Sequence, residues 1–219
     1  MNTMWMQKRH GFTLIEVLVT LVILMFGMLG LAGLVMKGHH ANFEAYQRNQ
    51  ALTIANDLAE RLKANQITPS GTFTNTSTAA AYVLGAPLLT PLGGPASTKY
   101  KALFVDHTTP DCRAVTCTRA QMVEYDLGLW EAELLGGNEA RADGATVGGI
   151  ISARGCVEGP LAAPSAPGTY RVSIAWQGNV PTAVPPSSAC GLGLYKDDSP
   201  AVNDRTRRLV SVDVTISLP

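Results

Sequence analysis

The sequence is poor in charge and contains none of the common short motifs of enzyme active sites. Charged residues make up 16% of the 219 residues, against about 25% in a typical soluble protein. The shortfall falls in an apolar segment near the N-terminus and in a middle region rich in Ser, Thr, Gly and Pro. The motifs G-x-S-x-G, G-x-G-x-x-G and H-E-x-x-H and the P-loop are all missing. We therefore expect a non-enzymatic protein without catalytic residues, a cofactor or a metal site.

Neither sign of charge dominates the composition. Lys and Arg together number 17, as do Asp and Glu, and a chain without Lys8 and Arg9 would have 15 basic residues (17 − 2) against 17 acidic ones. Because nucleic-acid-binding domains are usually strongly basic, no nucleic-acid partner is expected. The one basic cluster beyond the anchor is Arg205, Arg207 and Arg208 at the start of a predicted strand. We interpret it as a solvated sheet edge, with DNA contact as the alternative.

One long apolar segment dominates the N-terminal region. Residues 11–36 read GFTLIEVLVTLVILMFGMLGLAGLVM, and Glu16 is the only charged residue among them. About 20 residues of helix are enough to cross a bilayer. Lys8 and Arg9 precede the segment, so the positive-inside rule places that end in the cytoplasm and the rest of the chain across the membrane. The apolar run is longer than that of an ordinary signal peptide.

The residues around this boundary resemble a known export signal. Residues 8–19, K-R-H-G-F-T-L-I-E-V-L-V, resemble the class III signal of type IV pilins and pseudopilins. The resemblance implies that prepilin peptidase cuts after Gly11, that Phe12 becomes the N-methylated terminus, and that Glu16 is the family's glutamate at the fifth mature position. Residues 1–11 are then the leader, and residues 12–36 are the transmembrane half of a long helix.

Glu16 has two interpretations. A carboxylate inside a membrane is costly and is usually retained for a partner, and the amino group of Phe12 in a neighbouring subunit would supply a cation during assembly. Alternatively, Glu16 lies in the first turn of a helix, where the macrodipole favours an anion. Gly27, Gly30 and Gly33 also have two interpretations, because glycines soften a helix but also let helices approach closely in lipid.

Residues 37–65 are predicted to continue the helix as an amphipathic half. Apolar and small residues recur at three- and four-residue spacing, while Glu44 with Arg48 and Asp57 with Arg61 form i,i+4 pairs on other faces. The stripe consists of Phe43, Tyr46, Gln50, Ala51, Ile54, Ala55, Leu58 and Leu62. The rival interpretation, a coiled-coil stalk, would need a longer stripe.

Residues 66–219 are predicted to form a periplasmic α+β head. After a Ser/Thr/Gly/Pro-rich loop over residues 66–98, we expect a short strand over residues 101–106. Thr118 and Gln121 indicate a capping box for a second helix, which Gly136 and Gly137 would end. Three further strands are expected over residues 146–157, 170–176 and 209–218. They predict an antiparallel sheet with one buried face, covered by the helical stripe, which is the pilin fold.

The four cysteines all follow the anchor, in what would be the oxidising periplasm, so disulfides are expected. Three pairings are open. We favour Cys112 with Cys117, which closes a small loop before the helix at Thr118, and Cys156 with Cys190, which ties an inter-strand loop to a strand end. A zinc site is the alternative, although no C-x2-C motif is present.

A narrower resemblance covers most of the chain. The C-x4-C loop followed by T-x-A-Q-M-x-x-Y-D-L-x-x-W (residues 112–130) and Y-R-V-S-I-A-W-Q-G (residues 170–178) resemble minor pilins of the PilV type. This resemblance implies a role in initiating type IV pilus assembly within a minor-pilin tip complex, in support of adhesion or twitching motility. The implied partners are other minor pilins, the major pilin, prepilin peptidase and the inner-membrane assembly platform. The alternatives are a minor pseudopilin of type II secretion and a membrane-tethered periplasmic binding domain.

Overall fold

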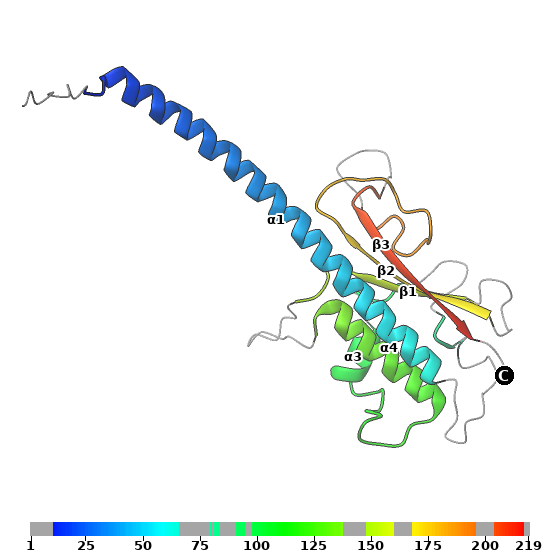
Figure 1. Ribbon diagram of the computed structural model, residues 1–219. Helices are drawn as coiled ribbons and strands as arrows, with labels where there is room; N and C mark the ends of the chain where they lie inside the picture. The colour runs from blue at the N-terminus through cyan, green and yellow to red at the C-terminus, as the bar shows by residue number, and fades with distance from the viewer. Residues whose placement is uncertain are drawn as a thin grey trace, which may run out of the picture. The chain divides into compact units, whose positions relative to one another are not determined.

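The computed structural model describes residues 11–65, 79, 81–83, 91–94, 98–137, 148–159, 168–195 and 204–216 (Figure 1). The chain divides into two compact units, one ending at Phe43 and one that begins at Glu44. Helix α1 (Leu14–Ala64) is continuous through both units, as predicted from its unbroken run of helix-compatible residues. Most of the predicted loop over residues 66–98 lies outside the described residues.

The second unit is built on a three-stranded antiparallel sheet with the order β1-β2-β3. Its strands are β1 (Arg154–Glu158), β2 (Gly168–Gln177) and β3 (Arg207–Ile216). Val172 of β2 lies between Val157 of β1 and Val212 of β3. The alternating apolar residues of β2 and β3 therefore share one face, as their period of two predicts.

The later half of α1 packs on this face, and α4 (Arg119–Leu135) lies beside it (Figure 1). The buried residues of α1 follow helical spacing, namely Gln47, Ala51, Ile54, Ala55, Leu58, Ala59 and Leu62. Phe43 and Tyr46 were predicted to belong to this buried stripe, but they are 41% and 64% exposed. That part of the prediction is wrong, because the buried face of α1 begins only at Gln47.

Helix α4 begins and ends where its sequence predicted. The Thr118 side chain accepts a hydrogen bond from the Gln121 backbone N–H, the Gln121 side chain accepts one from the Thr118 backbone N–H, and Gly136 ends the helix in the left-handed conformation. Trp130 is fully buried and donates from Nε1 to the carbonyl oxygen of Ile54 on α1, at 3.1 Å. Its ring lies over Gly155 of β1, where an added Cβ would come within 2.4 Å of it. Trp130 therefore ties α4 to both α1 and the sheet.

The predicted strand over residues 101–106 is instead a helix, α3 (Lys99–Phe104). Two contacts with α4 explain the difference. The fully buried carboxyl group of Glu131 accepts hydrogen bonds from the backbone N–H groups of Tyr100 and Gly93, each at 2.7 Å. Leu103 packs against Gly128, where an added Cβ would lie 2.9 Å from it. This segment thus packs on α4 and does not pair with a neighbouring strand.

The strand predicted over residues 146–157 is also shorter than expected. Residues 146 and 147 lie outside the described residues, residues 148–153 are not in a strand, and β1 begins at Arg154. Ser152 adopts a positive φ of 52° in this segment, while Ile150 is buried. The apolar residues among 148–153 therefore reflect packing in the core and not pairing with a neighbouring strand.

The opposite face of the sheet is covered as well, which the prediction of one buried face missed. Cys156, Ala175, Cys190 and Tyr195 form a second buried cluster there. The Tyr195 hydroxyl donates to the carbonyl oxygens of Ser152 and Ala175, at 2.8 and 3.0 Å. The disulfide between Cys156 and Cys190 joins β1 to the same covering segment.

The basic cluster before β3 is not a solvated edge. Arg207 is only 1% exposed, and its guanidinium donates to the carbonyl oxygens of Pro185, Ser188 and Cys190 at 2.8 to 2.9 Å. Arg208 pairs with Glu44 at 3.1 Å, so Glu44 does not form the predicted pair with Arg48. Only Arg205 of the three is exposed. Arg207 and Arg208 bind loop carbonyl groups and Glu44, and these contacts within the second unit explain their positions.

We predict that Arg207→Gln destabilises the second unit by about 2 to 4 kcal/mol, because it leaves buried carbonyl groups without donors. Arg205→Gln removes the same charge from an exposed position and should change the free energy of unfolding by less than about 0.5 kcal/mol. Denaturant unfolding of the full chain in detergent micelles measures both changes. Equal effects of the two variants would contradict the buried role of Arg207.

Candidate processing and assembly site

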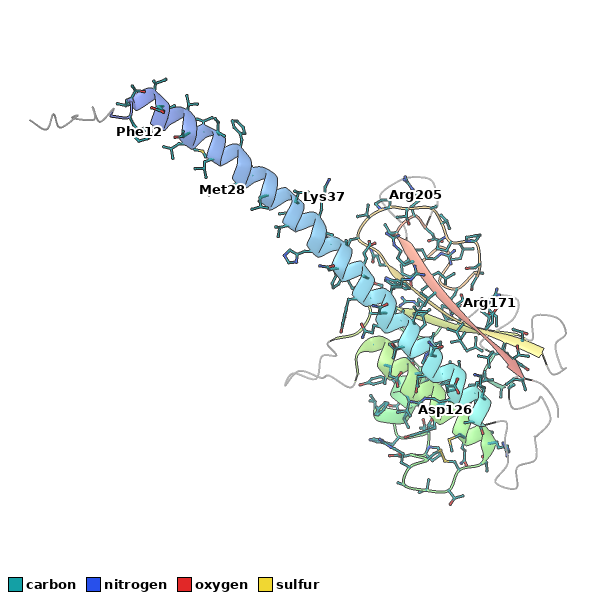
Figure 2. All side chains as sticks on the ribbon, viewed as in Figure 1. Phe12, Met28, Lys37, Asp126, Arg171 and Arg205 are labelled. Atoms are coloured by element: carbon teal, nitrogen blue, oxygen red, sulfur yellow. A yellow bond between two sulfur atoms is a disulfide. The ribbon has the colours of Figure 1, made fainter. Side chains whose placement is uncertain are left out.

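The candidate site begins with the residues just before α1. Gly11, Phe12 and Thr13 precede the helix, and Phe12 is 83% exposed (Figure 2). The Thr13 hydroxyl oxygen accepts a hydrogen bond from the Glu16 backbone N–H at 3.3 Å, and its carbonyl oxygen accepts from Glu16 and Val17. Thr13 therefore acts as an N-cap. The peptide bond after Gly11 lies outside the helix and is not protected by helical hydrogen bonds.

Glu16 lies in the first turn of α1. Thr13 and Glu16 have the spacing of a capping box, a local signal that the sequence reasoning missed. Within the described residues Glu16 forms no ion pair. Within these residues Glu16 therefore meets only the partial positive charge of the helix terminus, worth about 0.3 to 1 kcal/mol.

The apolar side chains between Phe12 and Met36 are exposed along the whole segment. Their exposed fractions run from 41% at Val22 to 83% at Leu14. The most apolar part of α1 has a mean hydropathy of 2.6, and none of it is buried. The one hydroxyl within residues 14–36 of the helix, that of Thr20, donates to the carbonyl oxygen of Val17 at 2.8 Å. The segment is therefore long and apolar enough to cross a membrane without leaving that hydroxyl unpaired.

Gly27, Gly30 and Gly33 lie within the unbroken helix. A Cβ added at any of them would meet no atom within 4 Å, so no packing within the described residues requires glycine there. Small residues at helical spacing permit the close approach of another helix in lipid. This geometry suits the helix-packing interpretation of the glycines and gives no sign of a break.

The cysteines belong to the second unit and pair as favoured from the sequence. Cys112 is bonded to Cys117, which closes a short loop directly before the N-cap of α4, and Cys156 is bonded to Cys190. All four thiols are used, so none remains to bind zinc. Within the described part of the chain, no three His, Cys, Asp or Glu side chains gather as a metal site would require.

Comparison with known proteins finds one match at this site. A family model described as the prokaryotic N-terminal methylation motif matches residues 6–32. No curated protein and no solved structure matches the chain. The matched region includes Gly11, Phe12, Glu16 and most of the exposed apolar segment.

The match supports a prepilin-type signal and a protein similar to type IV pilins or pseudopilins. Such a signal implies processing by prepilin peptidase and insertion in the membrane. The α+β fold with its long N-terminal helix and two disulfides agrees with this class. The same signal is typical of structural proteins.

We predict that the wild-type chain stays in the membrane during carbonate extraction, and that a Leu21→Arg/Leu24→Arg variant is largely released. Each arginine near the centre of a membrane helix costs about 2.5 to 3.5 kcal/mol on insertion scales. The matched control is Leu192→Arg/Leu194→Arg, at exposed positions of the second unit, which should leave extraction unchanged. Release of the wild-type chain would contradict the membrane anchor.

Proposed function

We propose that the chain is a minor pilin that helps to initiate type IV pilus assembly, as part of a minor-pilin complex at the filament tip. Through the pilus it would support adhesion or twitching motility. The observation that carries this proposal is the methylation motif over residues 6–32, which leads directly into a helix with a fully exposed apolar surface. The second unit has its own core, so the apolar segment is free to serve assembly.

In this proposal prepilin peptidase cuts after Gly11, and the new amino terminus of Phe12 is methylated. The methylated amine keeps its positive charge. Gly11 and Phe12, the described residues before Thr13, lie outside the helix, which supports access to the bond after Gly11. The exposed ring of Phe12 supports its recognition as the first mature residue.

Glu16 would then pair with the amino terminus of Phe12 in a neighbouring subunit. Glu16 has no ion pair within the described residues, and a buried charge without a partner is costly in lipid. Because the pair forms only between subunits, it would fix the axial shift of one helix against the next. Gly27, Gly30 and Gly33 would let those helices approach closely.

The proposed location and partners follow from the same signal. Lys8 and Arg9 support a cytoplasmic start at the inner membrane, and the two disulfides suit a periplasmic head. The partners would be other minor pilins, the major pilin and the inner-membrane assembly platform, and the final location would be the pilus. The PilV-type assignment rests on two ranges. Residues 112–130 contain the first disulfide loop and most of α4, and residues 170–178 contain most of β2.

Two rival functions lead to different phenotypes. A minor pseudopilin of type II secretion carries the same kind of signal, and its deletion would abolish secretion while surface pili remain. A membrane-tethered binding domain would function with Gly11 uncut. Our proposal expects deletion to reduce surface pili, and expects the intact gene, but not a Gly11 variant that blocks cutting, to restore them.

We predict that Glu16→Ala and Glu16→Gln leave the protein inserted and processed, but lower its amount in sheared filaments by about tenfold or more. A tenfold loss corresponds to about 1.4 kcal/mol, which is modest for an ion pair in lipid. Thr20→Ala is the control, because that hydroxyl bonds within its own helix. Immunoblots of sheared filaments measure the amount, and wild-type incorporation of Glu16→Ala would refute the role of this residue.

A further inference from the structure

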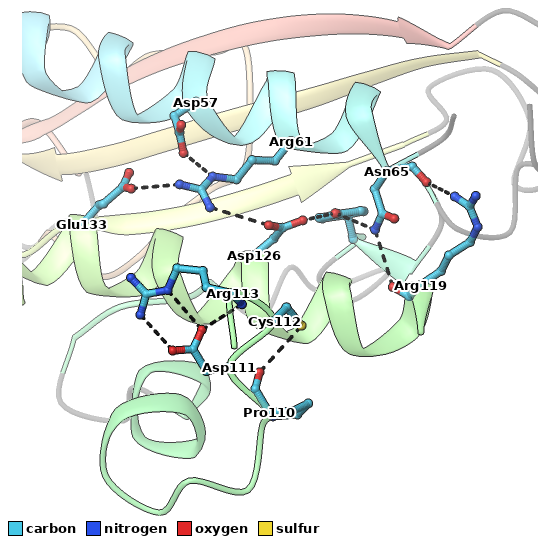
Figure 3. A network of polar contacts seen from close by, with 11 residues as sticks. Asp57, Arg61, Asn65, Pro110, Asp111, Cys112, Arg113, Arg119, Asp126 and Glu133 are labelled. Carbon is cyan, nitrogen blue, oxygen red and sulfur yellow. Dashed lines mark hydrogen bonds and ion pairs between the residues drawn. The ribbon is translucent and has the colours of Figure 1, made fainter. Parts of the chain in front are cut away.

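Three carboxyl groups surround one arginine where α1 packs on α4. Arg61 of α1 lies 2.5 Å from Asp57, one turn earlier on the same helix. From α4, Asp126 approaches Arg61 to 3.6 Å and Glu133 to 3.4 Å (Figure 3). These four residues are called the Arg61 cluster below. If all three carboxyl groups were ionised, one guanidinium would face three negative charges, and the cluster would carry a net charge of −2.

The three carboxyl groups differ in exposure and in the contacts that stabilise their charged forms. Asp126 is 6% exposed and also accepts a hydrogen bond from the fully buried Tyr82 hydroxyl, at 2.5 Å. Asp57 has the short contact with Arg61 and is 41% exposed at its side chain. Glu133 is less exposed, at 24%, and Arg61 is its only ion-pair partner among the described residues. Glu133 is therefore the carboxyl group that gains least from being charged.

We propose that the Arg61 cluster is a proton-operated clamp between α1 and α4, in which Glu133 takes up a proton from solvent. With Glu133 neutral, Asp57 and Asp126 share Arg61 without a third negative charge. When Glu133 loses the proton, the excess charge repels across the helix interface and weakens the packing of α4 on α1. No co-reactant other than solvent is needed.

The electrostatic surroundings of Glu133 agree with this role. Burial raises the pKa of Glu133 to about 7, the negative charge of Asp57 adds to the increase, and Arg61 opposes it. Burial also raises the pKa of Asp126, against the hydrogen bond from Tyr82 and the charge of Arg61. The charged groups that act on Glu133 thus come from α1, and within the described residues no side chain of α3 or the sheet adds to them.

Solvent can reach the cluster through a cleft of about 350 Å³, lined in part by Arg61, Asp126, Asn65, Arg119 and Met122. The cleft lies between the end of α1 and the beginning of α4. Glu133 does not line this cleft, but its side chain is 24% exposed, so it can exchange a proton with solvent without unfolding of the second unit. The charge state of the cluster also affects a surface that is open to other molecules.

The sign of the pH effect follows from the raised pKa. Below about pH 4.5 Glu133 is protonated in both the folded and unfolded states, so it favours neither. From there to about pH 7 the folded state holds a proton that the unfolded state has lost, so the stability that this proton provides falls as pH rises. The pKa of Asp213, beside Arg171, is lowered instead, and its contribution is lost only on further acidification.

The test is thermal unfolding of the full chain in detergent micelles between pH 5 and pH 8. The wild-type midpoint should fall as the pH rises. Glu133→Gln keeps the shape of the side chain and an acceptor for Arg61, and it should raise the midpoint at pH 8 by about 3 to 6 °C and leave it nearly unchanged at pH 5. Glu60→Gln, at an exposed residue of α1 paired with Lys63, should keep the wild-type pH dependence.

A second measurement separates the clamp from a merely structural carboxyl group. Hydrogen exchange, corrected for its intrinsic pH dependence, should show faster opening of α4 amides at pH 8 than at pH 5.5 in the wild type, and no difference in Glu133→Gln. A wild-type midpoint that is flat or rising over this range would overturn the proposal. So would a Glu133→Gln chain with the wild-type pH dependence, or one that is less stable at every pH.

Discussion

The exposed apolar surface of α1 is the constraint on which the rest of the structure depends. From Leu14 to Met36, apolar side chains project from a regular helix and are not covered by any described part of the chain. Exposing such a surface to water costs about 25 cal/mol for each Å², so it must face lipid or other apolar helices. The paired hydroxyl of Thr20 and the uncrowded glycines are compatible with both environments.

The same constraint explains why the second unit has a complete core of its own. If the anchor has to leave the bilayer for a filament, the head cannot depend on the anchor for folding. The head includes only the later half of α1, beginning with the contact of Glu44 and Arg208, and packs the buried face of that half against α4 and the sheet. Disulfides and the buried Arg207 then fix the loops that close the far face. Helix α1 thus contributes to both units, while the second unit keeps its own core.

Local and periodic signals predicted the parts of the fold that depend on local chemistry. The sequence predicted the capping box at Thr118, the helix end at Gly136 and the alternation in β2 and β3, because each is set by residues close in sequence. The helix over Lys99–Phe104 could not be predicted from the sequence, since its conformation depends on contacts with Glu131 and Gly128 of α4. The burial of Arg207 depends on carbonyl groups of a distant loop, and the Arg61 cluster depends on how α1 meets α4. Tertiary contacts of this kind leave little trace in local composition.

The candidate site at the start of α1 could be predicted because it depends on residues close in sequence. Gly11, Phe12 and Glu16 lie within two turns of one another in sequence, and the methylation motif covers them all. What the motif leaves open is whether the cut is made. The most direct test is the intact mass of the protein purified from its own membranes. Our account predicts the mass of residues 12–219 with one methyl group on Phe12, and a chain that still begins at Met1, or begins anywhere other than Phe12, would contradict it.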